Sequence, residues 1–161
     1  MNCVSINPLE QREPGVAERI HAVQLAAYAQ EAALLQVKHF PVLQRTSVDV
    51  KSSKERFLGA FAGNELVGAV SIETGPKSTQ RCIASLVVAP SHQRQGIGRL
   101  LLAAALHECA SSVVTVSTGA KNLPALALYA ELGFVECARR SLGPETLELV
   151  TLRRSPAGQD T

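Results

Sequence analysis

The chain of 161 residues has no tryptophan, and its aromatic side chains are limited to two tyrosines and four phenylalanines. Its longest aliphatic run, Leu100–Leu106, is far shorter than the ~20 apolar residues that a membrane-spanning helix needs. The chain also lacks an initial basic segment followed by an apolar one, which is the signature of a secretory signal. We therefore expect a cytoplasmic protein that is neither exported nor inserted into a membrane.

Cysteines are few and far apart in the sequence. Cys3, Cys82, Cys109 and Cys137 form neither a Cys-x-x-Cys pair nor a Cys/His spacing typical of a metal site. In a reducing compartment such isolated cysteines are free thiols. The sequence therefore predicts no metal ion and no disulfide framework.

A marked excess of charge of one sign is missing as well. Lys and Arg together number 16 and Asp and Glu 14, which gives a formal net charge of +2. A nearly neutral chain without a basic, aromatic-rich face gives no reason to expect a nucleic acid as partner, and no acidic patch favours a polycationic substrate. With 46% hydrophobic residues the chain can bury a core, and we expect one domain over residues 1–154 and a disordered tail over residues 155–161.

The hydrophobic pattern changes its period along the chain. Apolar residues from Val16 to Ala27 recur at helical spacing, which predicts a helix from Pro14 to about Val37 with Pro14 in its first turn. Thr46 can cap a second, short helix, and Gly63-Asn64 suits a tight hairpin turn. Strands are predicted at Arg56–Ala62, Glu65–Glu73, Gln80–Val88, Val113–Thr118, Val135–Leu142 and Thr146–Leu152, a further strand is compatible with Cys3–Leu9, and two more helices are predicted at Gly96–Ala110 and Pro124–Leu132.

The segment Gln93–Arg99 leads from one of these strands directly into a helix. The first amides of a helix have no intrahelical acceptors and lie at the positive end of the helix dipole, so they can hold a phosphate group. Gly96 and Gly98 would let an anion approach the backbone, and Arg94 and Arg99 could add charge-assisted hydrogen bonds. The alternative is a tight strand-to-helix turn that binds no ligand.

Two common nucleotide patterns do not fit this segment. The pattern GxxxxGK[ST] is absent, and Leu101 stands where the dinucleotide pattern GxGxxG needs a small residue. The segment instead resembles the pyrophosphate loop of the GNAT superfamily of acyl-CoA-dependent N-acyltransferases, whose signature [Q/R]-x-x-G-x-[G/A] is matched by Gln93, Gly96 and Gly98. A later stretch is similar to a second motif of that family, through Asn122, Ala125, Leu128, Tyr129, Leu132, Gly133 and Phe134.

The resemblance implies an α/β (α+β) fold with a mixed, mostly antiparallel sheet of six to seven strands and about four flanking helices. The sheet would splay between its fourth and fifth strands, here Gln80–Val88 and Val113–Thr118. The resemblance also implies acetyl-CoA as co-substrate, with its pantetheine arm in that gap. Its contacts would be the backbone of Leu86, Val87 and Val88, the pyrophosphate loop Gln93, Arg94, Gln95, Gly96, Ile97, Gly98 and Arg99, and Asn122 on the arm.

The same resemblance implies an N-acetyltransferase that acts on a primary amine of a small molecule or peptide, by direct attack in a ternary complex. Tyr129 would be the general acid that protonates the departing thiolate, although it could also be an ordinary core aromatic residue. Asn122 can cap the helix that follows it, a role compatible with a contact to coenzyme A.

A base for the amine is not evident from the motifs. Related enzymes often carry a Glu on the strand before the pyrophosphate loop, where this chain has Cys82 and Ala84, and the ribosomal-protein-alanine acetyltransferases carry a Glu at the position of Ser117. The remaining carboxylates are Glu73, which we take as the candidate base, and Glu31 on the first helix. Each could equally be a surface group, and a held water could act instead.

The acceptor site has no signature in the first fifty residues. His39, Phe40 and Arg45 could line a pocket or pack as ordinary loop residues. The missing base leaves a non-catalytic acyl-CoA-binding or sensing module as the alternative function, and Ala69 and Ala84 could leave room for a longer acyl group. A homodimer formed through the closing strands is compatible with the habit of the family.

Overall fold

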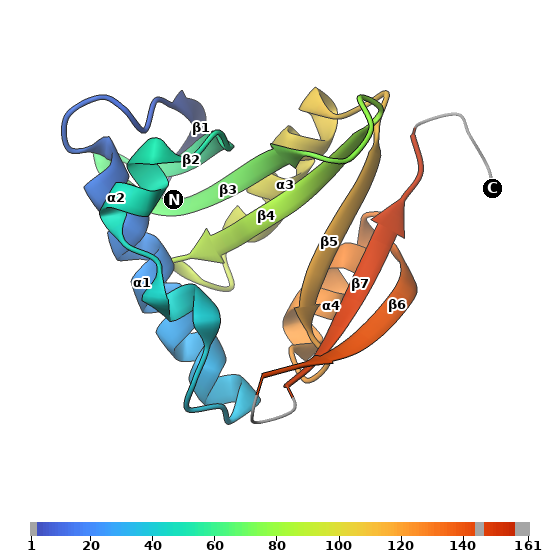
Figure 1. The fold of residues 1–161 in the computed structure, drawn as a ribbon. Coiled ribbons are helices and arrows are strands. Elements are labelled where there is room, and N and C mark those ends of the chain that lie inside the picture. The colour runs from blue at the N-terminus through green and yellow to red at the C-terminus, as the bar shows by residue number, and fades with distance from the viewer. Residues whose placement is uncertain (1–2, 144–146, 157–161) are drawn as a thin grey trace.

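Seven strands form one mixed sheet in the computed structural model, which describes residues 3–143 and 147–156 (Figure 1). Their order across the sheet is β1-β2-β3-β4-β5-β7-β6, and only β4 and β5 run parallel among these neighbours. The fold class implied by the resemblance is therefore confirmed. The strands are β1 Val4–Leu9, β2 Arg56–Ala62, β3 Glu65–Thr74, β4 Gln80–Val88, β5 Val113–Gly119, β6 Val135–Leu142 and β7 Leu147–Arg154.

Helices cover both faces of the sheet. Alternating side chains of a strand point to opposite faces, so Phe57 joins one hydrophobic cluster and its neighbour Leu58 joins another. The first cluster includes α1 and α2, and the second includes α3 and residues of α4. The helices are α1 Val16–Leu35, α2 Ser47–Ser52, α3 Ile97–Glu108 and α4 Leu123–Glu131, with short 3₁₀ turns η1 Pro41–Gln44 and η2 Pro90–His92.

The local predictions hold with small shifts at element ends. Thr46 caps α2 through a capping box with Asp49, and Gly63, with φ of 62°, begins the two-residue turn between β2 and β3. The prediction that Pro14 lies in the first turn of α1 is wrong. Gly15 takes a left-handed conformation with φ of 80° and becomes the N-cap, so Pro14 lies before the helix.

The gap between β4 and β5 is the feature that positions the site. The two strands pair only from Gln80 with Val113 to Ile83 with Val116, and then they diverge (Figure 1). Beyond Ile83, β4 pairs with β3 alone. At this end of β4, Val87 is buried, whereas Leu86 and Val88 are half-exposed beside the gap.

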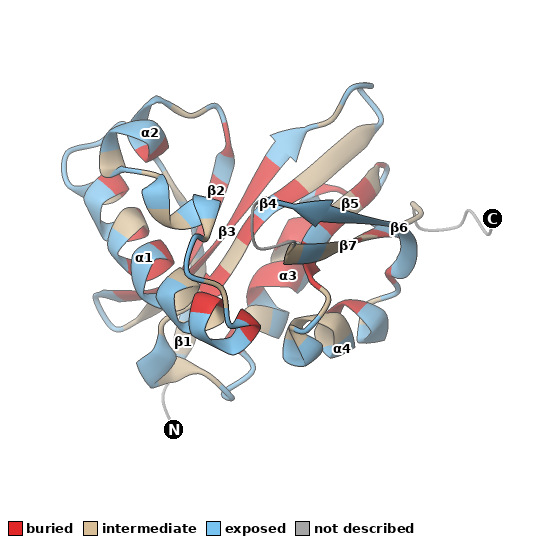
Figure 2. Ribbon diagram, turned by 60° about the horizontal axis from the view of Figure 1, so that its bottom comes forward, coloured by how far each residue is buried: buried red, intermediate tan, exposed pale blue. Residues whose placement is uncertain are grey.

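The closing hairpin is more exposed than the rest of the sheet. Every residue of β6 is exposed, since this strand lies at the sheet edge (Figure 2). The predicted start of the last strand at Thr146 lies outside the described residues, as does the predicted tail from residue 157 onward. No helix among the described residues is long and apolar enough to cross a bilayer.

Candidate active site

The loop before α3 contains two residues with a left-handed backbone, Arg94 with φ of 62° and Gly96 with φ of 81°. Gly96 is the N-cap residue, and no side chain caps the helix. The first backbone amides of α3 are therefore available to an anion at the positive end of the helix dipole. A Cβ added at Gly96 would meet no atom within 4 Å, so glycine is favoured here by its φ and not by lack of space.

One side chain of this loop and one of the helix that follows it hold the two elements in place. Gln93 donates from Nε2 to the carbonyl oxygen of Val88 over 3.1 Å and to Oε1 of Gln30 on α1. Arg99, in the first turn of α3, forms an ion pair with Glu131 of α4. The loop is thus tied to the end of β4 and to α1, while α3 is tied to α4.

A first cavity of about 590 Å³ opens between this loop, the end of β4, α1 and α4. Its size falls within the ~300–1,000 Å³ that is usual for ligand sites. Of the predicted contacts to the co-substrate, Gln95 is the one that does not line it, and the predicted acid Tyr129 does. The predicted residues that line it are Leu86, Val87, Val88, Gln93, Arg94, Gly96, Ile97, Gly98, Arg99 and Asn122.

Two helices, α1 and α4, form walls of the first cavity that the predicted contacts did not include. Residues of α1 and α4 that belong to no predicted contact set line it, as does His92. Ala125 and Leu128 belong to the second motif, but the other apolar residues of these helices gave only a signal for packing against a sheet. The lining residues outside the predicted contacts are Ala27, Gln30, Leu34, His92, Pro124, Ala125 and Leu128, whereas Glu31 was already one of the two candidate carboxylates.

A second cavity of about 200 Å³ adjoins the first. Its wall comes from α1, η1, β4, β5, α4, the end of β6 and the start of β7. In Figure 1 the gap between β4 and β5 opens toward this hairpin and the C-terminal half of α1. The two cavities share five lining residues and therefore meet at them: Glu31, Leu86, Asn122, Ala125 and Tyr129.

Tyr129 belongs both to the core and to the junction of the cavities. Its side chain packs against Phe134 with ring centroids 5.6 Å apart, and only 5% of the residue is exposed. Burial raises the pKa of its hydroxyl, so the phenol stays protonated at neutral pH. The two explanations offered for this residue, core aromatic and site residue, are compatible.

Glu31 and Asn122 bridge α1 and α4 at the same junction. Asn122 donates from Nδ2 to Oε1 of Glu31 over 3.2 Å and to Oγ1 of Thr118 over 3.4 Å. Its Oδ1 accepts from the backbone amide of Ala125 over 3.3 Å, which confirms the predicted N-cap. Burial raises the pKa of Glu31, and the hydrogen bond from Asn122 partly opposes that rise.

The predicted base Glu73 is not brought to this junction. It lies exposed near the end of β3 and lines neither cavity. Partial burial and the neighbouring Glu55 raise its pKa, and Arg45 lowers it. Arg45 pairs with Glu55 over 3.1 Å and lines neither cavity, so it acts as a loop anchor.

Some of the other residues singled out in the sequence line the second cavity, and others do not. Phe40 lines the second cavity and packs edge-on against Tyr28, whereas His39 does not line it. Ala84 also lines this cavity, but Ala69 is fully buried in the cluster under α1 and lines neither cavity. Ser117 lines the wall and shares a hydrogen bond of 2.8 Å with Thr151.

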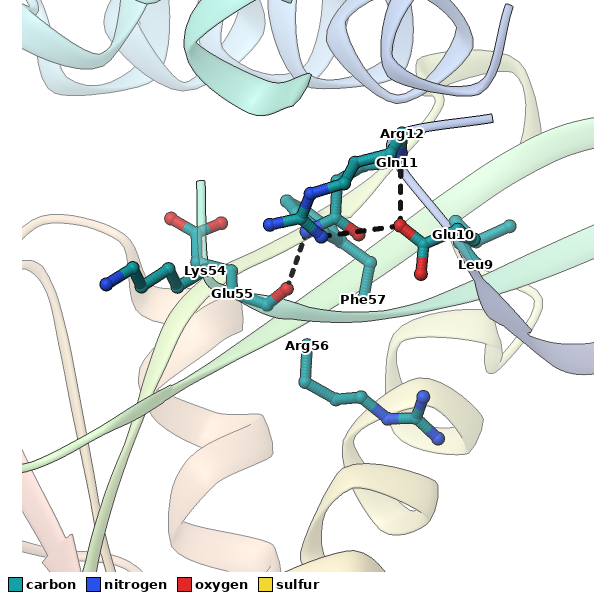
Figure 3. Close-up of a pocket in the computed structure, with 8 residues that line it drawn as sticks. All are labelled: Leu9, Glu10, Gln11, Arg12, Lys54, Glu55, Arg56 and Phe57. Atoms are coloured by element: carbon teal, nitrogen blue, oxygen red, sulfur yellow. Dashed lines mark hydrogen bonds and ion pairs between the residues drawn. The ribbon is translucent and has the colours of Figure 1, made fainter. Parts of the chain in front are cut away.

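A third cavity, of about 270 Å³, lies between the ends of β1 and β2 and shares no lining residue with the other two (Figure 3). Most of its polar side chains are already paired. Gln11 donates to the carbonyl oxygen of Glu55 over 2.8 Å, and Arg12 pairs with Glu10 over 3.4 Å. None of its lining residues lies at the start of a helix, and neither of the other two cavities meets it at a pair of proton-transfer groups. The junction of the first two cavities is therefore the better candidate.

The composition of the junction limits its chemistry. One carboxyl group and one protonated phenol face the same opening, next to a loop suited to an anion. Among the described residues, no group of three or more His, Cys, Asp or Glu side chains could hold a metal ion, and all four cysteines are free. The arrangement is suited to proton transfer at both ends of a reaction between two bound molecules.

Comparisons with known proteins agree with this geometry. Residues 20–134 match the model of the Acetyltransferase (GNAT) family. The UPF0157 protein YqkA of Bacillus subtilis is 35% identical over 127 residues, which are 78% of this chain and 36% of that protein. The chain thus spans about a third of the length of this relative.

Solved structures share the fold at low sequence identity. The ribosomal-protein-S18-alanine N-acetyltransferase from Escherichia coli superposes with a TM-score of 0.75 at 19% identity, covering 99% of both chains. The putative acetyltransferase yncA from Salmonella typhimurium, solved with its cofactor acetyl-CoA, superposes with a TM-score of 0.75 at 15% identity, covering 99% of this chain and 97% of the other.

Proposed function

The chain belongs to the GNAT acetyltransferase family, and from that premise we propose that it transfers the acetyl group of acetyl-CoA to a primary amine by direct attack in a ternary complex. One observation carries the proposal. The cavity beside the anion-binding loop and the smaller cavity beside it meet at Glu31 and Tyr129, in the gap where β4 and β5 have separated. Two substrates can therefore reach one pair of proton-transfer groups from two sides.

The residues of the first cavity fit the co-substrate. The uncapped amides at the start of α3 would hold its pyrophosphate, and Arg94 would add positive charge at the rim. The backbone of Leu86, Val87 and Val88 faces the gap and would bind the pantetheine arm. When bound, acetyl-CoA supplies the thioester that is the acyl donor.

The two ionisable groups at the junction have different tasks in this proposal. Glu31 takes a proton from the amine, directly or through one water, so that the nitrogen can form its bond to the acetyl carbon. A backbone amide of Leu86–Val88 stabilises the negative charge on the carbonyl oxygen. As the bond from carbon to sulfur breaks, Tyr129 donates its proton to the sulfur, and positioning of the two reactants supplies a large share of the rate.

Glu31 replaces Glu73 as the proposed base because it lines both cavities and Glu73 lines neither. This change also removes the motive for the alternative function, a non-catalytic acyl-CoA-binding or sensing module, which rested on the lack of a base. The Asn122 hydrogen bond holds the Glu31 carboxyl toward the gap. Asn122 is therefore a positioning residue for the base as well as the cap of α4.

The test combines calorimetry with an assay of free thiol released from acetyl-CoA in the presence of primary amines. We expect heat of binding with acetyl-CoA, amine-dependent release of CoA, and a Tyr129→Phe variant whose kcat falls by about 10²-fold while its affinity for acetyl-CoA stays within about twofold. Phe134→Leu serves as the packing control, since Phe134 contacts the same ring but lines neither cavity. An unchanged kcat in Tyr129→Phe would remove the general acid from the mechanism.

A further inference from the structure

We infer that the second cavity binds the acceptor, and that the acceptor is a compact monoamine on an apolar carbon chain, with neither a carboxylate nor a second ammonium group. The inference rests on the proposed function and specifies its substrate. It follows from three properties of the cavity wall, which are its apolar character, its single charged group and the pairing of its serine and threonine hydroxyl groups.

Hydrophobic side chains dominate the wall, and they come from five separate parts of the chain. Removal of one methylene group from water favours binding by about fourfold, so an alkyl or phenyl group would gain affinity with each carbon that enters. At the density of protein interiors, about 200 Å³ holds on the order of ten non-hydrogen atoms. The apolar wall residues are Phe40, Pro41, Val42, Ile83, Ala84, Leu86, Val116, Ala125, Leu142, Leu147 and Leu149.

Glu31 is the only Asp, Glu, Lys, Arg or His among the lining residues that the structure describes. Tyr28 remains neutral, because burial raises the pKa of its hydroxyl to about 12. One ammonium group can therefore pair with the Glu31 carboxylate, whereas a second would be desolvated without a partner. A carboxylate on the acceptor would meet no cation in the wall and would be repelled by Glu31.

The serine and threonine hydroxyl groups in the wall, those of Ser85, Ser117 and Thr118, already have partners. Ser85 shares a hydrogen bond of 2.9 Å with Ser71 and accepts another from Gln24 over 3.2 Å. Ser117 is paired with Thr151 over 2.8 Å. A polyhydroxylated acceptor would have to compete with these bonds, so the wall favours an acceptor whose only polar group is its amine.

Three substrates with the same five-carbon chain test the inference. Pentylamine, 1,5-diaminopentane and 5-aminopentanoate differ only in whether the far end is methyl, ammonium or carboxylate. At saturating acetyl-CoA we expect kcat/KM for pentylamine to exceed that of each charged analogue by at least about tenfold. Equal or faster transfer to either charged analogue would overturn the inference while leaving the acetyltransferase function intact. A faster reaction with a tetrapeptide that begins with Leu would overturn the assignment to a small molecule.

A binding measurement separates the failure of the substrate class from the failure of the chemistry. Calorimetry of pentylamine with the CoA-bound protein should give heat, and a lack of heat would refute the inference. Heat without any acetyl transfer would instead refute the proposed function and keep the binding site. The two failures therefore give different results, no heat in the first case and heat without acetyl transfer in the second.

A pair of variants on β6 locates the bound chain. Leu142 lines the second cavity and is 38% exposed, whereas Val135, on the same strand, is 69% exposed and lines neither cavity. Leu142→Asp should raise KM for pentylamine by about tenfold or more. It should also reduce the ratio of kcat/KM for pentylamine to kcat/KM for 1,5-diaminopentane. Val135→Asp should leave both values unchanged. Equal effects of the two variants would place the acceptor elsewhere.

Discussion

Replacement of Glu31 by Gln should lower activity and preserve or raise stability. Gln has nearly the same shape, and its Oε1 can still accept the hydrogen bond that Asn122 donates over 3.2 Å. The variant keeps the link between α1 and α4 and removes only the ability to take a proton. A positioned general base contributes about 10²–10⁴-fold, so we expect kcat/KM to fall by that factor, which corresponds to about 3–5 kcal/mol of barrier.

The stability effect has the opposite sign because burial is the main influence on Glu31. Burial raises its pKa in the folded protein above the ordinary value of 4.5. A carboxyl group of this kind costs stability as pH rises from its unfolded pKa through its folded pKa, since the folded state must then hold a poorly solvated charge. At neutral pH the wild-type protein carries this cost, and Glu31→Gln does not. At a pH well below 4.5 both states are protonated and the difference should vanish.

The assay is kcat/KM for pentylamine across a range of pH, combined with thermal unfolding at about pH 4 and about pH 7. In the wild-type protein the low-pH limb of the profile should lie above the ordinary Glu pKa of 4.5, and it should be absent in Glu31→Gln. Glu18→Gln is the matched control, because Glu18 lies exposed on the same helix and lines neither cavity. A Glu31→Gln variant with unchanged kcat/KM and an unchanged profile would refute the role of Glu31 as base.

Further predictions concern the loop and the cap. Gly96→Ala should destabilise the protein by about 1–2 kcal/mol in urea unfolding and weaken acetyl-CoA binding, because the left-handed φ of 81° disfavours a Cβ. Gly98→Ala should not destabilise the fold, since its Cβ would meet Leu128 and Val88 at ordinary distances of 3.7 and 3.8 Å, but it should weaken binding because this Cβ would enter the first cavity. The reverse order of stabilities would contradict this account of the loop. Asn122→Ala should cost about 1 kcal/mol through loss of the cap. Asn122→Asp should keep the cap and shift the kcat/KM profile to higher pH, since a second carboxylate would raise the pKa of Glu31; a shift to lower pH would argue against their contact.

Local chemistry made much of the fold predictable. The helix cap at Thr46 and the hairpin turn at Gly63 depend on neighbouring residues, so the sequence is sufficient to identify them. The loop proposed to bind the pyrophosphate is likewise a continuous segment, and its motif residues Gln93, Gly96 and Gly98 all line the first cavity. The error at Pro14 arose because proline favours a first helical turn in general, whereas the left-handed Gly15 moved the helix start past it.

The sequence by itself determined the strands, the helices and the loop between Val88 and Ile97, since these follow from side-chain period, caps and backbone preferences within a few residues. Only the tertiary structure decided which carboxylate faces the gap. Glu31 meets Asn122 across 91 positions in the chain, and that contact exists because α1 packs beside β4 at the place where β5 turns away. Glu73 has the same side-chain chemistry, but its place near the far end of β3 keeps it outside both cavities.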